Sequence, residues 1–158
     1  MEYRQLGRTR IRVSEIGFGA GIVAGLFLRG TADDQLLATR RAIELGINHF
    51  DTAPLYGDGT SEVNLGRALG RLKANVIVGT KVEYRTENFN DIQGQTRESI
   101  ASSLLRLERE FVDVIYLHNN IRFEGAGPHD GYESVTPDQV LKPGGIADAH
   151  RNCAADQA

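Results

Sequence analysis

The feature of this sequence that most limits its fold is a regular alternation of short apolar segments with segments of helical spacing. The apolar segments are rich in β-branched and aromatic residues, which is typical of buried strands. Between them, leucine and isoleucine recur at intervals of four and three, which is typical of a helix with one buried face. The alternation predicts four strand–helix units, with strands at residues 14–19, 47–51, 75–80 and 111–117.

Strands that alternate with helices favour an α/β fold in which helical crossovers connect a parallel sheet. Two architectures fit, a (β/α) barrel and an open, doubly wound sheet. Residues 19–24 (GAGIVA) match the loose G-x-G-x-x-A pattern of dinucleotide-binding open sheets. That pattern requires a helix that begins at its glycines, whereas helix signals here begin only at Thr31. A flexible first loop is therefore the favoured interpretation of these glycines.

Both flanks of the alternating region differ from it. Residues 3–6 and 11–14 flank a turn at Gly7, which predicts a short N-terminal β-hairpin. After residue 120 the sequence is rich in glycine, proline and polar residues, which predicts a loop-rich tail with room for one short helix. The sequence is thus divided into a folded region at 1–120 and a tail at 121–158.

Charge and composition narrow the functional classes. The net charge is −3, and no cluster of basic residues points to nucleic acid or to an anionic membrane. The single cysteine, Cys153, cannot form an internal disulfide, as expected for a protein of the reducing cytosol. A lone cysteine also gives no indication of a metal site. No apolar run approaches the roughly 20 residues that span a bilayer. We therefore expect a soluble cytoplasmic protein without a metal.

Polar side chains stand at the ends of three successive predicted strands. Asp51 ends the second strand, Lys81 follows the third and His118 follows the fourth. Tyr56 lies in the loop that begins after Asp51. Taken singly, each fits an ordinary role, such as a turn cap for the aspartate. Parallel βα folds place their active sites at the carboxyl ends of the strands. The occurrence of all four side chains at or near such ends therefore indicates that they form a catalytic site.

The chemistry of these four side chains is mutually consistent. A tyrosine ordinarily has a pKa of about 10, too high for an efficient acid near neutrality. A neighbouring ammonium favours the phenolate, and a carboxylate paired with the ammonium keeps it charged and in position. An imidazole can hydrogen-bond the same carbonyl oxygen and orient it. Together they can protonate a developing alkoxide, but a hydride would have to come from a nicotinamide cofactor.

The segment GINHFDTAPLYG at residues 46–57 resembles the signature of the aldo-keto reductases, G-[hydrophobic]-x-x-[aromatic]-D-T-A-x-x-Y-G. Lys81 and His118 fall where that family has its remaining catalytic residues, and the resemblance covers about residues 1–120. Other segments are similar to the start of the family and to the continuation of its signature: YRQLGR at 3–8, VSEIGFG at 13–19, Ser61 and Glu62, and LGRAL at 65–69.

The resemblance implies a (β/α)8 TIM-type barrel, of which about the first four units are present, and an oxidoreductase that uses NADPH or NADH, with NADPH favoured. A hydride would pass to an aldehyde or ketone, or back from an alcohol or sugar. Tyr56 would be the general acid/base, assisted by Lys81, and Lys81 would pair with Asp51. His118 would orient the substrate carbonyl. The residues near the nicotinamide end of the cofactor would be Gly19, Ala20, Gly21 and Asp51.

The chain departs from the family in length, because a (β/α)8 barrel takes about 250 residues and this chain has 158. We expect a truncated product that lacks most of the cofactor-holding half, so that its affinity for NADPH is weak or absent. Exposed edges of a half barrel predict self-association. A second interpretation is a non-catalytic fragment or regulatory subunit, and a third is an open-sheet nucleotide-binding module. Three residues are expected to be either substrate-pocket walls or packing residues: Phe18, Leu55 and Tyr84.

Overall fold

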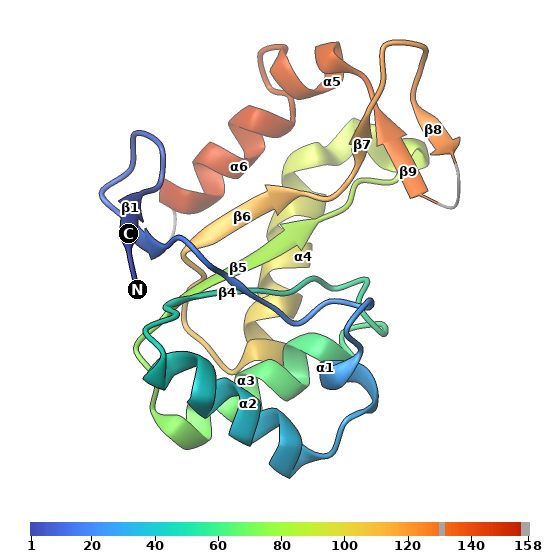
Figure 1. The fold of residues 1–158 in the computed structure, drawn as a ribbon. Helices are drawn as coiled ribbons and strands as arrows, with labels where there is room; N and C mark the ends of the chain where they lie inside the picture. Colours follow the sequence, from blue (N-terminus) through green and yellow to red (C-terminus); the bar gives the residue numbers. More distant parts are fainter. Residues whose placement is uncertain (130–131, 156–158) are drawn as a thin grey trace. The chain divides into compact units, whose positions relative to one another are not determined.

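Figure 1 shows the fold as a computed structural model, which describes residues 1–129 and 132–155. The chain forms two compact units. The first comprises Met1–Thr80 and Ser103–Val114, and the second comprises Lys81–Ser102 and Ile115–Ala158. The boundary falls within strand β5 (Ile77–Val82), within helix α4 (Ile92–Leu107) and within strand β6 (Val114–Leu117), so these three elements contribute to both units.

The first unit begins with the predicted hairpin, in which β1 (Tyr3–Gln5) and β2 (Arg12–Ser14) pair antiparallel. The side chain of Asn48 holds this hairpin through two hydrogen bonds. Its Oδ1 accepts a hydrogen bond from the backbone N–H of Ser14 at 2.7 Å, and its Nδ2 donates to the carbonyl of Arg12 at 2.9 Å. One side chain thus ties β2 to the residue that precedes the strand at 49–51.

The main sheet is parallel. Strand β3 (Phe18–Gly19) pairs with β4 (His49–Asp51), which pairs with β5, and the complete order is β3-β4-β5-β6 with β6 at Val114–Leu117. Each strand therefore lies beside the next one in sequence, as in a βα barrel, whereas a doubly wound sheet reverses its order at a switch point. The strand order supports the barrel interpretation over the open sheet.

The strands begin and end at slightly different residues from those predicted. Strand β4 occupies only the last three residues of the predicted 47–51, and β5 extends past the predicted end at Thr80 to Val82. Strand β6 begins at Val114 rather than at Phe111. Phe111 is 49% exposed although Val112 is buried, so the start of the predicted segment is not uniformly buried as its apolar sequence suggested.

Helices α2 (Ala32–Glu44) and α3 (Thr60–Leu72) pack against each other in the first unit. As predicted, Thr31 caps α2, and its hydroxyl accepts a hydrogen bond from the N–H of Asp34 at 3.2 Å. Gly46 follows the helix with a φ of 87°, a left-handed conformation that favours glycine at this end. The predicted apolar face of α3 is buried at Leu65 and Leu69.

The glycine-rich loop after β3 does not lead into a helix that begins at Gly21. It leads into a four-residue helix, α1 (Leu26–Arg29), whose N-cap is Gly25. The Phe27 side chain is 1% exposed and packs edge-to-face on the Phe18 ring at 5.7 Å. The dinucleotide-fingerprint interpretation therefore lacks the helix it requires, and the loop expected to be flexible is anchored by Phe27.

The second unit adds several elements after β5. A 3-10 helix, η1 (Thr86–Asp91), leads into α4. A separate sheet has the order β7-β9-β8, and helices α5 and α6 pack together. The bounds are Asn120–Ile121 for β7, Gly127–His129 for β8, Tyr132–Val135 for β9, Pro137–Leu141 for α5 and Ile146–Ala155 for α6.

The tail beyond residue 120 therefore holds more regular structure than its loop-like composition predicted, although residues 130–131 and 156–158 lie outside the described part. Helix α5 begins with a capping box formed by Thr136 and Gln139. Helix α6 buries one side of small and medium apolar residues at intervals of three and four: Ile146, Ala149 and Cys153. The sequence left room for one short helix in this tail. The described residues form two, α5 and α6, because small residues at helical spacing are enough to bury one side of α6.

Tyr84 is the largest fully buried side chain of the second unit. Its hydroxyl lies 2.6 Å from Oγ1 of Thr96, and the His150 ring stacks on it at 6.0 Å between centroids. Burial raises the pKa of Tyr84 to about 12 and lowers the pKa of His150. Both groups are therefore held neutral by the apolar surroundings of α4 and α6.

Among the described residues, no helix is both long and apolar enough to cross a membrane.

Alkaline pH is expected to destabilise the second unit through Tyr84. The folded chain holds its pKa at about 12, whereas a tyrosine in an unfolded chain ionises near about 10. The stabilisation is therefore fully present below about pH 10 and is lost as the pH rises toward 12, by roughly 3 kcal/mol in total. Denaturant unfolding followed by circular dichroism should show this decline, and Tyr84→Phe should flatten it. An equally steep decline in Tyr84→Phe would contradict the assignment.

Helices α3 and α4 approach closely at Gly66. A Cβ at this position would collide with the carbonyl oxygen of Leu107 and lie 2.8 Å from its Cα. Gly66→Ala should therefore lower the free energy of unfolding by about 1–3 kcal/mol. Gly70, in the same helix, has no atom within 4 Å of such a Cβ, so the control Gly70→Ala should stabilise the helix by about 0.5–1 kcal/mol. Thermal unfolding of the two variants distinguishes crowding from helix propensity.

Candidate active site

Asp51 is the last residue of β4, and the backbone at this point is tied to both neighbouring strands. The N–H of Ala20 donates to the carbonyl of Asp51 at 2.8 Å, and the N–H of Thr52 donates to the carbonyl of Gly79 at 3.0 Å. Asp51 therefore lies at the carboxyl end of the sheet, as predicted, where parallel βα folds place their sites.

Tyr56 lies in a tight loop between β4 and α3. Its N–H donates to the carbonyl of Ala53 at 3.2 Å, and its own carbonyl accepts from the N–H of Ser61 at 3.1 Å. Three consecutive residues after it have positive φ, Gly57 at 65°, Asp58 at 51° and Gly59 at 84°. Two of the three are glycines, which adopt this conformation at little cost. The loop is thus a compact series of turns, and the phenol is carried on a defined backbone.

The loop after β3 lies beside Tyr56 in the same unit. A Cβ built on Gly21 would lie 3.7 and 3.8 Å from two ring carbons of Tyr56, so the glycine backbone packs near the phenol ring. Gly19 is exposed, and a Cβ there would meet no atom within 4 Å. The structure therefore brings together Gly21 with Tyr56 and Ala20 with Asp51, and leaves open space beside Gly19.

Lys81 and His118 lie in the second unit. Lys81 lies inside β5 rather than after its end, because the strand continues to Val82. Its Nζ lies 5.9 Å from the centroid of the Tyr116 ring, within cation–π range. His118 directly follows β6, as predicted, and its backbone N–H donates to the carbonyl of Val82 at 2.9 Å. The two residues thus sit on adjacent strands at the same end of the sheet.

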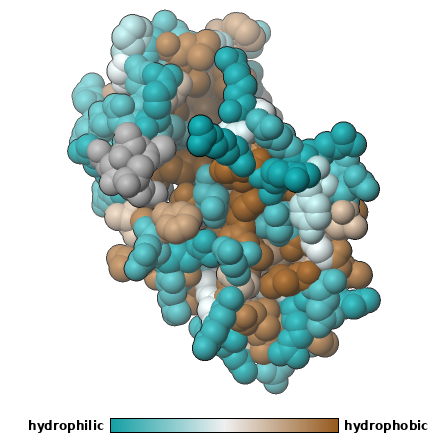
Figure 2. Space-filling view, turned by 90° about the vertical axis from the view of Figure 1, so that its left-hand side faces the viewer, coloured by the Kyte–Doolittle hydropathy of each residue, from teal (hydrophilic) through white to brown (hydrophobic). Residues whose placement is uncertain are grey.

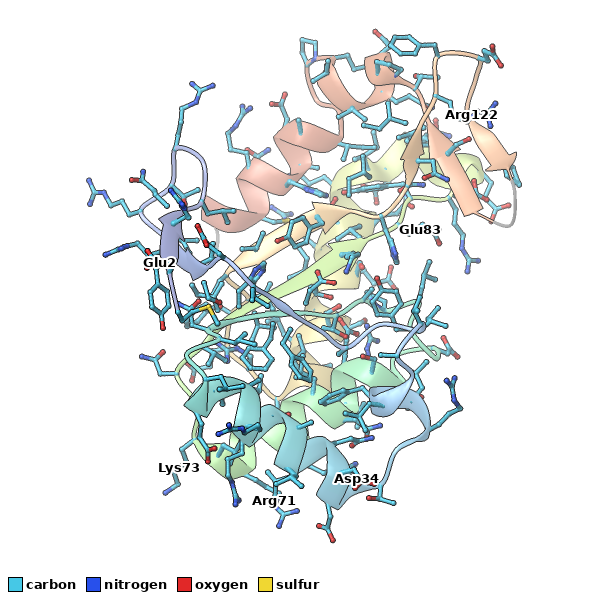
Figure 3. All side chains as sticks on the ribbon, viewed as in Figure 1. Glu2, Asp34, Arg71, Lys73, Glu83 and Arg122 are labelled. Carbon is cyan, nitrogen blue, oxygen red and sulfur yellow. The ribbon has the colours of Figure 1, made fainter. Side chains whose placement is uncertain are left out.

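Sequence reasoning missed the side chain that links the segments after β5 and β6. The Oδ1 of Asn119 accepts from the backbone N–H of Tyr84, and its Nδ2 donates to the carbonyl of Tyr84, both at 2.8 Å. Glu83, labelled in Figure 3, lies next to this bridge. Burial raises the pKa of Glu83, and a hydrogen bond from the backbone of Glu133 opposes this rise. Only the position of Asn119, directly after His118, could have signalled its role.

The three residues expected to be either pocket walls or packing residues, Phe18, Leu55 and Tyr84, differ in how much of their surface is exposed. Phe18 packs on Phe27 and, at 5.2 Å between centroids, on Phe50. Tyr84 is fully buried in the second unit. Leu55 is 40% exposed and lies in the same loop as Tyr56. Burial thus assigns Tyr84 to packing, whereas Phe18 is only half-buried and Leu55 has the most exposed surface of the three.

Comparison with known proteins identifies the class. Residues 15–124 match the aldo/keto reductase family, so the chain belongs to that family. It is 39% identical over 122 residues to L-galactose dehydrogenase from Arabidopsis thaliana. It is also 36% identical over 125 residues to a probable voltage-gated potassium channel subunit beta from Oryza sativa subsp. japonica. Each match covers 75% of this chain, but only 38% and 37% of the two relatives, so the chain spans about two fifths of their length.

Solved structures agree with this class and with the barrel-type α/β fold. An aldo-keto reductase from Bacillus halodurans in its holo form superposes with a TM-score of 0.63 at 32% identity, over 76% of this chain and 41% of that chain. An aldo-keto reductase from Klebsiella pneumoniae in complex with NADPH superposes with a TM-score of 0.66 at 22% identity, over 92% of this chain and 43% of that chain. The predicted family and fold class are therefore confirmed.

Proposed function

We propose that this chain carries the proton-transfer part of an NAD(P)-dependent oxidoreductase. It would reduce an aldehyde or ketone, or oxidise an alcohol or sugar, by hydride transfer. The observation that carries the proposal is the placement of Tyr56 in a chain of the aldo/keto reductase family. Its ring packs near Gly21, and its loop begins at Asp51 at the carboxyl end of β4.

In the proposed reaction Tyr56 is the general acid/base. Its hydroxyl gives a proton to the carbonyl oxygen while a hydride is added to the carbonyl carbon, and the phenolate takes the proton back in the reverse reaction. Lys81 favours the phenolate, and Asp51 pairs with Lys81 to keep the ammonium in place. His118 hydrogen-bonds the carbonyl oxygen and orients it. The positions at or near the ends of three successive strands support these roles.

The residues at the end of β3 fit the flat ring of a nicotinamide, which would supply the hydride when bound. Gly19 leaves open space where a side chain would otherwise project, and the buried Ala20 holds this loop on the carbonyl of Asp51 through its N–H. We propose that NADPH is the preferred cofactor and that Gly19, Ala20, Gly21 and Asp51 contact its nicotinamide end. The NADPH complex of the Klebsiella pneumoniae enzyme, which shares the fold, supports this cofactor class.

A non-catalytic role is the second candidate. The chain resembles a probable channel subunit from Oryza sativa subsp. japonica almost as closely as it resembles a dehydrogenase. It also spans about two fifths of either relative. A fragment or regulatory subunit would keep the fold of the first strands without turnover, so catalysis has to be measured on the chain itself.

Tyr56→Phe is expected to separate catalysis from cofactor binding. Removing the hydroxyl should lower the rate of NADPH-dependent carbonyl reduction by about 10²–10⁴-fold and leave NADPH affinity unchanged, because the ring next to Gly21 remains. Turnover is read from loss of reduced nicotinamide absorbance with a panel of aldehydes and ketones. Equal rates in both proteins would contradict the role of Tyr56, and absence of turnover in the unmodified chain would favour the non-catalytic role.

The affinity of the chain for NADPH is expected to be weak or undetectable. The residues proposed for the cofactor reach only its nicotinamide end, whereas tight binding requires further contacts to the rest of the ligand. Titration followed by nicotinamide fluorescence measures this affinity directly. A dissociation constant of about 1 μM or below, equivalent to about −8 kcal/mol, would contradict the expectation.

Self-association of the chain is a further expectation. Large apolar side chains are exposed in both units, among them Val23, Leu105 and Phe123. Figure 2 shows apolar side chains, in brown, that reach the surface between polar ones on the face viewed. Exposed apolar surface and sheet edges without partners favour association. Sedimentation velocity should therefore detect dimers or larger species, and a single monomeric species across the concentration range would refute the expectation.

A further inference from the structure

Two consecutive residues at the start of α3, Ser61 and Glu62, are fully buried although both are polar. The Ser61 hydroxyl donates to the carbonyl of Ala20 at 2.8 Å, and its oxygen lies 2.9 Å from Oγ1 of Thr52. Ser61 therefore joins the loop after β3 to the loop after β4. A buried polar group is retained at such a position only when hydrogen bonds replace its lost contacts with water.

Glu62 makes the corresponding link to the next strand and to α4. Its Oε1 accepts from the Thr80 hydroxyl at 2.6 Å, and its Oε2 accepts from Nε of Arg106 at 2.6 Å. Arg106 also donates to the Ser103 hydroxyl at 3.3 Å. Both oxygens of a fully buried carboxylate are thus satisfied by a strand on one side and a helix on the other. Loss of one partner of such a pair leaves a charge without compensation.

The Arg106 side chain also supports the loop that carries Tyr56. A Cβ at Gly59 would lie 2.5 Å from Cδ and 2.9 Å from Nε of Arg106, so the side chain lies directly against the glycine backbone. The N–H of Gly59 donates to the carbonyl of Pro54 at 2.7 Å, which closes the turns around Tyr56. The ion pair and the Tyr56 loop are therefore in direct contact.

Thr80 is the residue before Lys81 in β5, and the strand continues through both. Successive side chains of a strand point to opposite faces of the sheet. The Thr80 hydroxyl reaches Glu62 on the helix-covered face, so Lys81 projects from the other face. A hydrogen bond that fixes Thr80 therefore also fixes the backbone from which Lys81 projects.

We propose that Glu62, paired with Arg106, is a positioning residue that holds the backbone segments carrying Tyr56 and Lys81. The expected effect of Glu62 on catalysis rests on the proposed function. The expected effect on the position of Lys81 does not, and it can be measured without turnover. Glu62 acts through Thr80 and through Arg106 against Gly59, and it does not touch substrate or cofactor. A purely structural role predicts lower stability without any specific change at Lys81.

The test uses the full chain and the variant Thr80→Val, which removes the hydroxyl and keeps the Glu62–Arg106 pair. Thr39→Val is the matched control, because Thr39 is also fully buried in the first unit and donates its hydroxyl to the carbonyl of Gln35 at 2.7 Å. The sequence has only three lysines, Lys73, Lys81 and Lys142. Reductive methylation with isotopically labelled formaldehyde gives each an NMR signal, and Lys73, at the C-cap of α3 (Figure 3), serves with Lys142 as an internal reference.

The Lys81 signal is expected to shift by more than its line width in Thr80→Val, while the other two lysine signals stay in place. Thr39→Val should move none of the three. Thr80→Ser, which restores a hydroxyl, should return the Lys81 signal toward its original position. If Thr80→Val does not fold, Thr80→Ala compared with Thr80→Ser provides the same contrast. An unchanged Lys81 signal in the folded variant lacking the hydroxyl, or an equal shift in Thr39→Val, would overturn the proposal.

Kinetics provide the second measurement. If the unmodified chain reduces a carbonyl substrate, Thr80→Val should lower kcat by about tenfold to a hundredfold with little change in KM, because misplacement of catalytic groups by about 1 Å has effects of that size. An unchanged kcat together with a shifted Lys81 signal would overturn the catalytic part of the proposal. Absence of turnover in the unmodified chain would reject the proposed function, while the Lys81 signal would still decide whether the hydrogen bond from Thr80 to Glu62 positions that segment.

Discussion

The local arrangement of the first unit depends on the hydrogen bonds and the ion pair of one buried carboxylate, that of Glu62. A charge without water is costly, and Glu62 tolerates this environment because Thr80 and Arg106 both donate to it. Each donor brings its own element, so one side chain fixes α3 against β5 and α4. The adjacent Ser61 extends the same network to the loops after β3 and β4. The start of one helix is thus linked to the loops after β3 and β4, to β5 and to α4.

Glycines allow the backbone to approach this network closely. Gly59 accommodates Arg106, and Gly66 accommodates the end of α4 at Leu107, where a Cβ would collide in either case. Gly21 instead lets the backbone pack near the Tyr56 ring, and Gly19 leaves open space at the end of β3. The first pair serves packing and the second pair serves the candidate site. Gly19 and Gly21 lie at the end of β3 and Gly59 lies on the loop after β4, and parallel strands bring such carboxyl ends to one edge.

Local signals in the sequence predicted part of the fold and of the site. The hairpin, the Thr31 cap and the strand end at Asp51 depend on neighbours along the chain, so they could be read directly. One short helix was expected in the tail, but the bounds and the buried side of α6 could not be read, because the burial of Ala149 and Cys153 depends on other elements. The same applies to Asn119, whose side chain pairs with the backbone of Tyr84 on another segment.

The sequence by itself determined the alternation of strands and helices, the family signature at 46–57 and the four candidate catalytic residues, since periodicity and motif are properties of the chain. Tertiary structure decided which polar residues support them. In the sequence, Ser61 and Glu62 stood out only as a continuation of the signature. The hydrogen-bond partners of Ser61 lie 9 and 41 residues away along the chain, and those of Glu62 lie 18 and 44 residues away. The reason is physical: hydrogen bonds and ion pairs of buried groups depend on proximity in space, which spacing along the chain does not encode.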